Sequence, residues 1–316
     1  MALTNEPKRL WPVYLMLAFA TSTWGSAFIA GRFATESFDP ITVAFLRFFF
    51  ASLILIPIMI LKEKDRPKLN KKDWLLLCSL GLTGIAIYNI AFFTAAKYAP
   101  IVKSSLFIAV NPVLIILLSG LFLKETITKR NVTGLVLALT GAVIIITNGQ
   151  VLVTIQNGLQ PIDIVLLFAV VCWALYSVLG KVALAKFSTL TSTTYAVTIG
   201  TIMLMPFAIY ETNWTDMMGA NWLVWTSILH MSVIVTVVSF IMYYEGIKRI
   251  GAAKASLFIN FMPLSAVVLA VIFLGEPLHL SHVLGALFVI TGVTVGTRTR
   301  PLWSSKRNRL MKKQAS

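Results

Sequence analysis

Three ionisable side chains that lie within or at the edge of long apolar stretches could do chemistry in this chain: Arg47, His230 and Glu245. A guanidinium can bind a carboxylate, an imidazole can exchange a proton near neutral pH, and a carboxylate at membrane depth can hold an amine or a proton. We treat all three as coupling or gating candidates. Each has a structural alternative: Arg47 reaches toward the external interface, His230 is a hydrogen-bonded packing residue, and Glu245 pairs with Lys248 or Arg249.

Two further pairs occupy equivalent places in the two halves of the chain. Lys103 and Lys254 begin two apolar stretches, and Pro112 and Pro263 follow about nine residues later. Proline in a helix frees a carbonyl and kinks the chain, so these two either line a cavity or simply bend their helices. The lysines are either mirrored contacts for a gate or a substrate carboxylate, or interfacial residues whose amines reach toward water.

Aromatic and small polar side chains in the same stretches could form a binding site. Aromatic rings around a few amide and hydroxyl groups suit a small molecule with an apolar body and a polar end, although such rings also serve in ordinary packing. The aromatic candidates are Trp24, Tyr88, Phe92, Trp173, Tyr176 and Tyr243, and the polar candidates are Asn89, Ser105, Asn111, Ser256 and Asn260.

Ten apolar stretches must position these residues. About 20 apolar residues cross a bilayer as a helix, in which every backbone amide is satisfied internally. The stretches are Trp11–Gly31, Ile41–Leu61, Trp74–Ala96, Ser104–Leu123, Val132–Thr147, Ile164–Gly180, Thr191–Tyr210, Trp222–Tyr244, Ala255–Leu274 and Val283–Thr297. The predicted fold class is therefore an all-α polytopic membrane protein with ten transmembrane helices.

The basic residues predict the orientation of these helices. Of the 27 Lys and Arg, 23 fall at the two termini or in alternate gaps between the stretches. Short loops rich in Lys and Arg stay in the cytoplasm. Both termini are therefore predicted to be cytoplasmic.

Composition excludes several classes of protein. With 58% hydrophobic and 12% charged residues, the 316-residue chain has too little polar surface for a water-soluble domain. The net charge of +15 lies in thin loops and a tail, where it suits anionic lipid rather than nucleic acid. Cys78 and Cys172 have no metal-ligand spacing, and the sequence contains no phosphate-binding loop. We expect no cofactor, no metal and no catalytic residues.

The second half of the chain repeats the first. An offset of 149 aligns Trp24 with Trp173, and an offset of 151 gives 15 identities in the 48 positions of 97–144. Because each copy holds an odd number of spans, the second copy must enter the membrane from the opposite side. We predict two inverted five-helix repeats at 1–148 and 162–297, an external linker at 149–161 and a basic cytoplasmic tail at 298–316. Inverted repeats around a midplane site are an architecture of secondary transporters.

The duplicated motifs carry a family resemblance. The first copy holds Trp24-Gly25-Ser26 and Phe122-Leu123-Lys124-Glu125, and the second holds Phe273-Leu274-Gly275-Glu276-Pro277. Over about residues 11–297 the chain resembles the drug/metabolite transporter superfamily, in particular its EamA group of ten-helix bacterial permeases. The resemblance implies an inner-membrane carrier, commonly an exporter of amino acids or related metabolites. It also implies a cavity lined by the first, third, fourth, sixth, eighth and ninth spans.

The predicted function is secondary transport of a small metabolite by alternating access. The alternatives are multidrug efflux, an intramembrane enzyme, and a membrane-embedded sensor or partner-binding protein. The chain shows neither the paired intramembrane acids of such an enzyme nor the sizeable soluble domain of such a sensor. The expected partners are a small-molecule substrate and lipid, with protons as the favoured coupling ion if transport is coupled. Substrate, coupling and oligomeric state stay open at this point.

Overall fold

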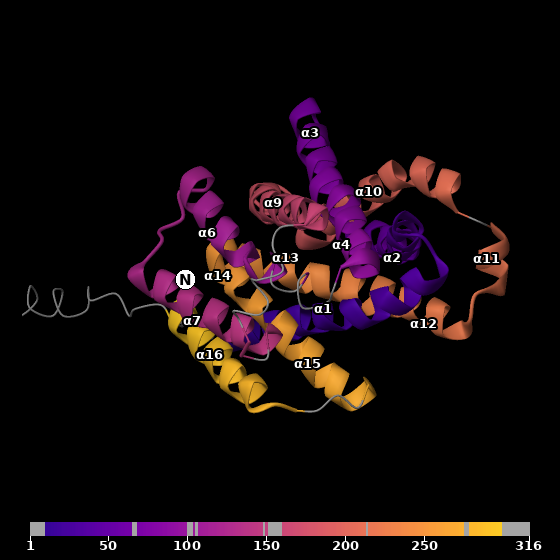
Figure 1. Cartoon of the computed structure of the whole chain (residues 1–316). Helices are drawn as coiled ribbons and strands as arrows, with labels where there is room; N and C mark the ends of the chain where they lie inside the picture. Colours follow the sequence, from indigo (N-terminus) through magenta and orange to yellow (C-terminus); the bar gives the residue numbers. More distant parts are fainter. Residues whose placement is uncertain are drawn as a thin grey trace, which may run out of the picture.

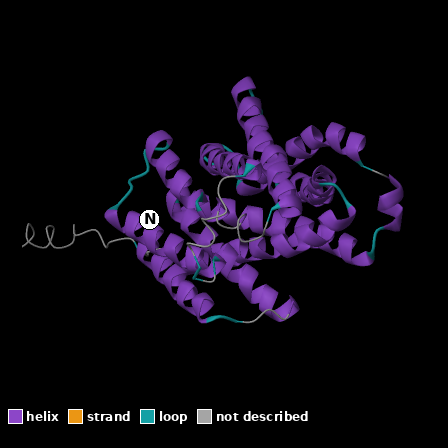
Figure 2. Cartoon of the chain, viewed as in Figure 1, coloured by secondary structure: helices purple, strands orange, loops and turns teal. Residues whose placement is uncertain are grey.

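The computed structural model describes residues 10–64, 68–99, 104, 107–147, 149–150, 160–212, 214–274 and 278–298, and all regular structure in them is helical (Figure 2). The first half contains α1 (Trp11–Ser37), α2 (Pro40–Lys62), α3 (Lys71–Leu80), η1 (Gly81–Ile87), α4 (Tyr88–Tyr98), α6 (Asn111–Phe122) and α7 (Lys129–Ile146). The second half contains α9 (Pro161–Ala183), α10 (Thr189–Glu211), α11 (Trp214–Gly219), α12 (Trp222–His230), η2 (Met231–Val238), α13 (Ser239–Ile250), α14 (Ala252–Ser256), η3 (Leu257–Asn260), α15 (Phe261–Leu274) and α16 (Leu280–Thr297).

Nine helical segments of the described chain are long and apolar enough to cross a bilayer. They agree with nine of the ten predicted stretches, whereas the fourth stretch is represented by the shorter apolar helix Phe107–Phe122. Side chains start several of these helices by binding the free amides of the first turn. Asn70 and Thr128 each accept a hydrogen bond from the backbone N–H three residues later, as capping boxes.

The third and eighth spans each contain a π-helical segment that sequence analysis did not predict. In the third span α3, η1 and α4 form one continuous rod, and in the eighth span α12, η2 and α13 do the same. π-helical turns are rare and occur often at functional sites. Their equivalent places in the two halves indicate that they belong to the repeated unit.

The ninth span is broken where sequence analysis expected a proline kink. Residues Leu257–Asn260 form the tight 3-10 turn η3, which separates α14 from α15. Pro263 follows, and a proline ring clashes with the carbonyl four residues earlier in a regular helix. In the first half, α6 begins at Asn111 with Pro112 in its first turn.

Equivalent helices of the two halves run antiparallel. Along α2 and α10, Thr42 Oγ1 lies 2.8 Å from Thr212 Oγ1, and Ser52 Oγ lies 3.2 Å from Thr201 Oγ1. Residue numbers therefore rise along α2 as they fall along α10.

The helices α7 and α16 lie side by side in Figure 1 and show the same reversal. A Cβ added at Gly141 would lie 2.5 Å from the carbonyl oxygen of Gly285, and one added at Gly134 would meet the backbone of Gly292 and Gly296. These glycines allow the two backbones to pack closely. The inverted relationship of the two five-helix units is thus confirmed by two independent pairs of equivalent helices.

Candidate functional site

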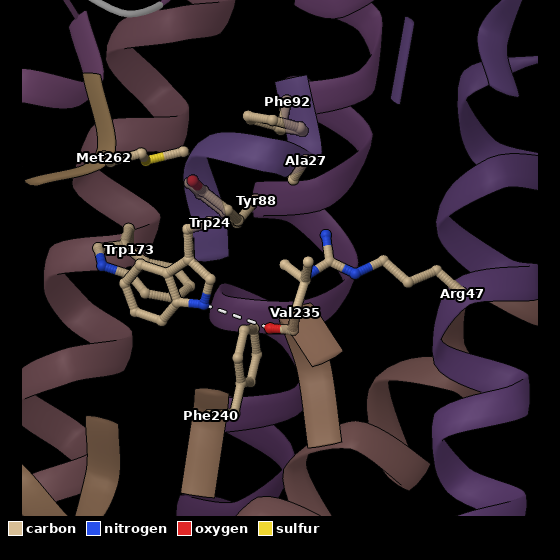
Figure 3. A pocket seen from close by; sticks show the side chains of 9 residues that line it. All are labelled: Trp24, Ala27, Arg47, Tyr88, Phe92, Trp173, Val235, Phe240 and Met262. Carbon is tan, nitrogen blue, oxygen red and sulfur yellow. Dashed lines mark hydrogen bonds between the residues drawn. The ribbon is translucent and has the colours of Figure 1, made fainter. Parts of the chain in front are cut away.

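A cavity lies between the two repeats, in the part of the bundle where their first spans meet (Figure 3). Its free volume, counted as space for the centre of a water-sized sphere, is about 20 Å³. Sites for drug-sized ligands hold roughly 300–1,000 Å³, so the cavity is nearly closed in this structure and must widen to admit a ligand. Its lining residues come from both halves and are Trp24, Ala27, Arg47, Tyr88, Phe92, Trp173, Val235, Phe240 and Met262.

Two equivalent tryptophans meet at the centre of this cavity. Trp24 lies in the middle of α1 and Trp173 in the middle of α9, with ring centroids 5.0 Å apart and planes at 87°. Such edge-to-face contact is a favoured arrangement of aromatic rings. Trp24 Nε1 also donates to the carbonyl oxygen of Val235 in η2, at 3.2 Å (Figure 3). Tyr88 packs on Trp173 from the third span, with ring centroids 4.7 Å apart.

Arg47 brings the second span into the cavity. Its side chain is only 4% exposed, so the expectation that it reaches toward the external interface is wrong. Its Nε donates to Thr236 Oγ1 at 2.8 Å and its Nη1 to Asn89 Oδ1 at 3.3 Å. The guanidinium carbon also lies 4.9 Å from the ring centroid of Phe48 and 5.9 Å from that of Phe240. In Figure 3 the Arg47 side chain extends from its helix toward Val235.

The two residues that hold Arg47 belong to the irregular parts of the third and eighth spans. Asn89 Nδ2 donates to the carbonyl oxygens of Gly84 and Ile85 in η1, at 3.1 and 3.0 Å. Thr236, in η2, donates from Oγ1 to the carbonyl oxygen of Met231 at 2.9 Å. Each side chain therefore satisfies backbone acceptors of a π-helical segment while it accepts a hydrogen bond from Arg47.

Several predicted substrate contacts lie away from the cavity. Tyr176 packs against Trp173 and stacks on Tyr244 but is not among the described residues that line the cavity. Asn111 is buried in α6 without a partner there. Ser256 and Asn260 donate to carbonyl groups of Ala253 and Leu257 in their own segment, which is a local structural use.

The predicted lysine pair is described in one half only. Lys254 is half-buried in α14 and does not line the cavity. Lys103 and Ser105 lie outside the described residues. Pro112 and Pro263 do not line the cavity either, but Met262, next to Pro263, does.

The remaining two coupling candidates differ in their surroundings. His230 Nε2 lies 2.7 Å from Ser26 Oγ, so it joins α12 to α1 near the cavity without lining it. Glu245 accepts a hydrogen bond from Arg249 Nε at 2.6 Å, one helical turn later. Glu245 therefore pairs with Arg249, which is the structural alternative to a coupling role.

Among the described residues, the cavity is lined from the first, second, third, sixth, eighth and ninth spans. The second span is an addition to the set implied by the family resemblance, and part of the start of the fourth span lies outside the described residues. Sequence analysis did not single out Ala27, Val235, Phe240 or Met262. Only Phe240 carried a usable signal, because it is an aromatic residue one turn before Tyr243 and Tyr244.

Polar contacts between the repeats close one end of the bundle. Glu63, after α2, accepts hydrogen bonds from Ser188 and Thr191 at the start of α10, and Lys186 pairs with Asp73 of α3. At the same end, Glu125 accepts from the backbone N–H groups of Ala252 and Ala253, at 2.9 and 3.0 Å. Glu125 therefore stabilises the start of α14, in the ninth span.

The opposite end is joined by fewer charged groups. Thr42 contacts Thr212 across the repeats, and the ring of Phe38 packs edge-on against Trp225 at 5.7 Å. The ion pair of Lys97 with Asp39, at 2.7 Å, stays within the first repeat. In the described chain, charged groups therefore join the repeats at one end, whereas hydroxyl and aromatic groups join them at the other.

Comparison with known proteins agrees with this architecture. Residues 11–147 and 160–297 each match the family described as "EamA-like transporter family". The chain is 30% identical over 281 residues to the "Uncharacterized transporter YyaM" of Bacillus subtilis (strain 168), covering 89% of this chain and 92% of that protein. It is 27% identical over 296 residues to a "Probable terminal-alkyne amino-acid exporter" of Streptantibioticus cattleyicolor, covering 92% of this chain and 94% of that protein.

A solved structure described as "Crystal structure of protein" shares the fold, with a TM-score of 0.70 and 18% identity over 90% of this chain and 97% of the other. The family match extends over both halves and includes all nine described residues that line the cavity. A second relative from Bacillus subtilis and one from Archaeoglobus fulgidus, 29% and 28% identical over 91% of this chain, are also named as uncharacterized transporters. This chain, a multi-pass membrane protein, belongs to the EamA-like transporter family.

Proposed function

We propose that this protein is a secondary transporter that exports a small metabolite, an amino acid or a related compound, by alternating access. The observation that carries the proposal is the cavity between the inverted repeats, where Trp24 and Trp173 meet at the middle of their spans. A site at the repeat interface near the midplane is what an alternating-access carrier requires. Aromatic rings and one cationic group suit a small amphipathic compound.

The contacts at the two ends of the bundle supply candidate gates. In alternating access, contacts between the repeats close one end while those at the other end are broken. Glu63 and Asp73 make such contacts at one end, and Thr42 makes one at the other. Each of these end contacts involves only one or a few polar groups. The free energies of the two states, open at one end or at the other, should therefore differ by only a few kcal/mol, which is the scale of a functional conformational equilibrium.

The orientation and direction also belong to this proposal. The distribution of Lys and Arg favours a bacterial cell membrane protein with both termini in the cytoplasm, so that Glu63 and Asp73 face the cytoplasm. Export is favoured by the relative whose printed name is that of a probable amino-acid exporter. Transport is facilitated or coupled to protons, with His230, which hydrogen-bonds Ser26 of the cavity-lining helix α1, as the candidate side chain for proton coupling.

Counterflow in proteoliposomes tests the proposal. Vesicles containing the full-length protein are loaded with a panel of unlabelled amino acids and related acids, and uptake of a trace of each labelled compound is followed. Transient accumulation of at least one compound, absent from protein-free vesicles, is the expected result. Absence of accumulation across the whole panel would contradict transport of this substrate class. Loss of the response to an imposed pH gradient in His230→Gln would support proton coupling, and an unchanged response would exclude that role for His230.

A further inference from the structure

Arg47 is a positive charge in the cavity without a negative partner in the described part of the protein. None of the nine lining residues is acidic, and the ion pairs of the described chain do not include Arg47. Its hydrogen-bond acceptors, Asn89 and Thr236, are both neutral. Thr236 lies near the middle of the 29-residue span Trp222–Ile250, which puts the charged group well inside the membrane.

The described acidic residues are placed elsewhere. Of the eight acidic residues whose side chains the structure describes, seven lie in the first or last turn of a helix or in the segment just outside it, and the eighth, Glu245, pairs with Arg249. The seven are Glu36, Asp39, Glu63, Asp73, Glu125, Asp163 and Glu211. The described part of the fold therefore keeps negative charge at the ends of the bundle and holds one positive charge at its centre.

Such an arrangement costs free energy unless something compensates for it. A charge removed from water without a counter-charge is strongly disfavoured, and arginine inside a membrane segment usually marks a pathway or a ligand partner. Thr236 and Asn89 use only part of the fork of N–H donors that a guanidinium presents. They also fix the orientation of that fork toward the cavity (Figure 3). The fork matches a carboxylate, which it can bind through two parallel hydrogen bonds.

We infer that Arg47 is the anion-binding residue of the cavity and that the transported metabolite docks a carboxylate on it. This inference rests on the proposed function and narrows its substrate class. The apolar body of the metabolite lies against Trp24, Trp173 and Tyr88, whose rings surround the cavity. One guanidinium neutralises one negative charge, so the single carboxylate of a monoanionic acid or a zwitterion is fully balanced in the cavity. The ammonium group of a zwitterion finds aromatic faces as partners, whereas a purely cationic compound meets Arg47 as a like charge.

Four compounds with the same ring test the charge requirement directly. They are 3-phenylpropanoate, L-phenylalanine, L-phenylalaninamide and phenylethylamine, of which only the first two carry a carboxylate. Binding to the purified full-length protein is measured from the quenching of tryptophan fluorescence and from the ligand-induced rise in melting temperature. We expect the two carboxylates to bind at least tenfold more tightly than the amide and the amine. Equal binding of all four, or no binding by either carboxylate, would overturn the inference.

Substitutions of Arg47 test whether carboxylate binding depends on this residue. Arg47→Gln removes the charge and is expected to weaken carboxylate binding about 30-fold or more, which equals about 2 kcal/mol. Arg47→Lys keeps the charge but loses the fork, so it should weaken binding about tenfold. Carboxylate binding within threefold of the unsubstituted protein in Arg47→Gln would overturn the inference.

Substitutions of Asn89 test the same inference if Arg47→Gln does not fold. Asn89→Asp places a carboxylate where Oδ1 now lies 3.3 Å from Nη1 of Arg47, so the protein supplies its own counter-ion and competes with the ligand. Asn89→Ala is the matched variant, since it loses the same two donations to Gly84 and Ile85 without adding charge. Carboxylates should bind at least tenfold more weakly to Asn89→Asp than to Asn89→Ala. Equal affinities in the two variants would overturn the inference.

Counterflow separates this inference from the proposed function. Carboxylate binding that depends on Arg47, without counterflow of any compound, would contradict transport and leave the anion site intact. Counterflow of an amine or a neutral compound that is unimpaired in Arg47→Gln would contradict the anion site and leave transport intact.

Discussion

Ser52 and Thr201 hydrogen-bond to each other, with their hydroxyl oxygens 3.2 Å apart, although they are equivalent residues of the two repeats. Their separation of 149 residues is the same as that of Trp24 and Trp173, which also touch. A residue can contact its own equivalent only where the pseudo-two-fold axis passes between them. These two pairs therefore locate the axis, and the cavity is beside it. Contacts on the axis can persist when the halves rock, whereas contacts at the ends must break.

Cross-linking tests this difference between axis and ends. In a variant lacking Cys78 and Cys172, the pair Thr42→Cys and Thr212→Cys is expected to abolish counterflow when oxidised, because it fixes one end of the bundle closed. The pair Ser52→Cys and Thr201→Cys should retain at least about half of the activity, since both residues lie on the axis. Reduction of the first pair should restore transport. The opposite pattern would contradict rocking about this axis.

Close packing of α7 on α16 predicts a strong effect at Gly141. A side chain at Gly141 meets the backbone of Gly285 and Val289, which cannot move aside as a flexible side chain could. Gly141→Val should therefore destabilise the protein by about 1–3 kcal/mol, measured by thermal unfolding in detergent micelles. Gly219→Val is the control, because nothing lies within 4 Å of a Cβ at that position. Equal melting temperatures for the two variants would contradict the packing role of Gly141.

Two glutamates that sequence analysis singled out should differ sharply when replaced. Glu125 binds two backbone amides at the start of α14, so Glu125→Ala leaves both without this partner and should cost about 1–3 kcal/mol. Glu245 pairs only with Arg249 on the same helix, so Glu245→Ala should change stability by less than about 0.5 kcal/mol. Denaturant titration in detergent micelles measures both. A transport defect in Glu245→Ala at normal stability would restore the coupling role considered for this residue.

The sequence contains enough information to predict the repeats, nine of the spans and the central tryptophans, because these depend on local hydrophobicity and on internal similarity. It also marks Arg47 as unusual, since its equivalent Ala196 is small and apolar. The depth of Arg47 was not predictable, because the direction of a long side chain depends on the helices that face α2.

The π-helical segments were not predictable for a related reason. A π-helical turn shifts the backbone pairing without any periodic change in hydrophobicity, and η1 and η2 read as ordinary apolar helix. The place of the second span in the cavity was not predictable for the same reason. Which face of that span turns inward is decided by contacts between helices, such as that of Arg47 with Thr236, and not by the span alone.

Trp24 should matter for the shape of the cavity as well as for its aromatic lining. Its indole N–H donates to Val235 in η2, so it holds a π-helical segment whose carbonyl groups are not all paired in the usual helical pattern. Trp24→Phe keeps an aromatic ring against Trp173 but leaves the Val235 carbonyl without this donor, which should destabilise the protein by about 1–3 kcal/mol. Because Val235 and Phe240 line the cavity, we also expect a lower counterflow rate for any accepted carboxylate.

Trp11→Phe is the control, since Trp11 is 57% exposed at the start of α1 and its replacement should affect neither measurement. Unchanged stability in Trp24→Phe would show that the hydrogen bond to Val235 does not maintain η2.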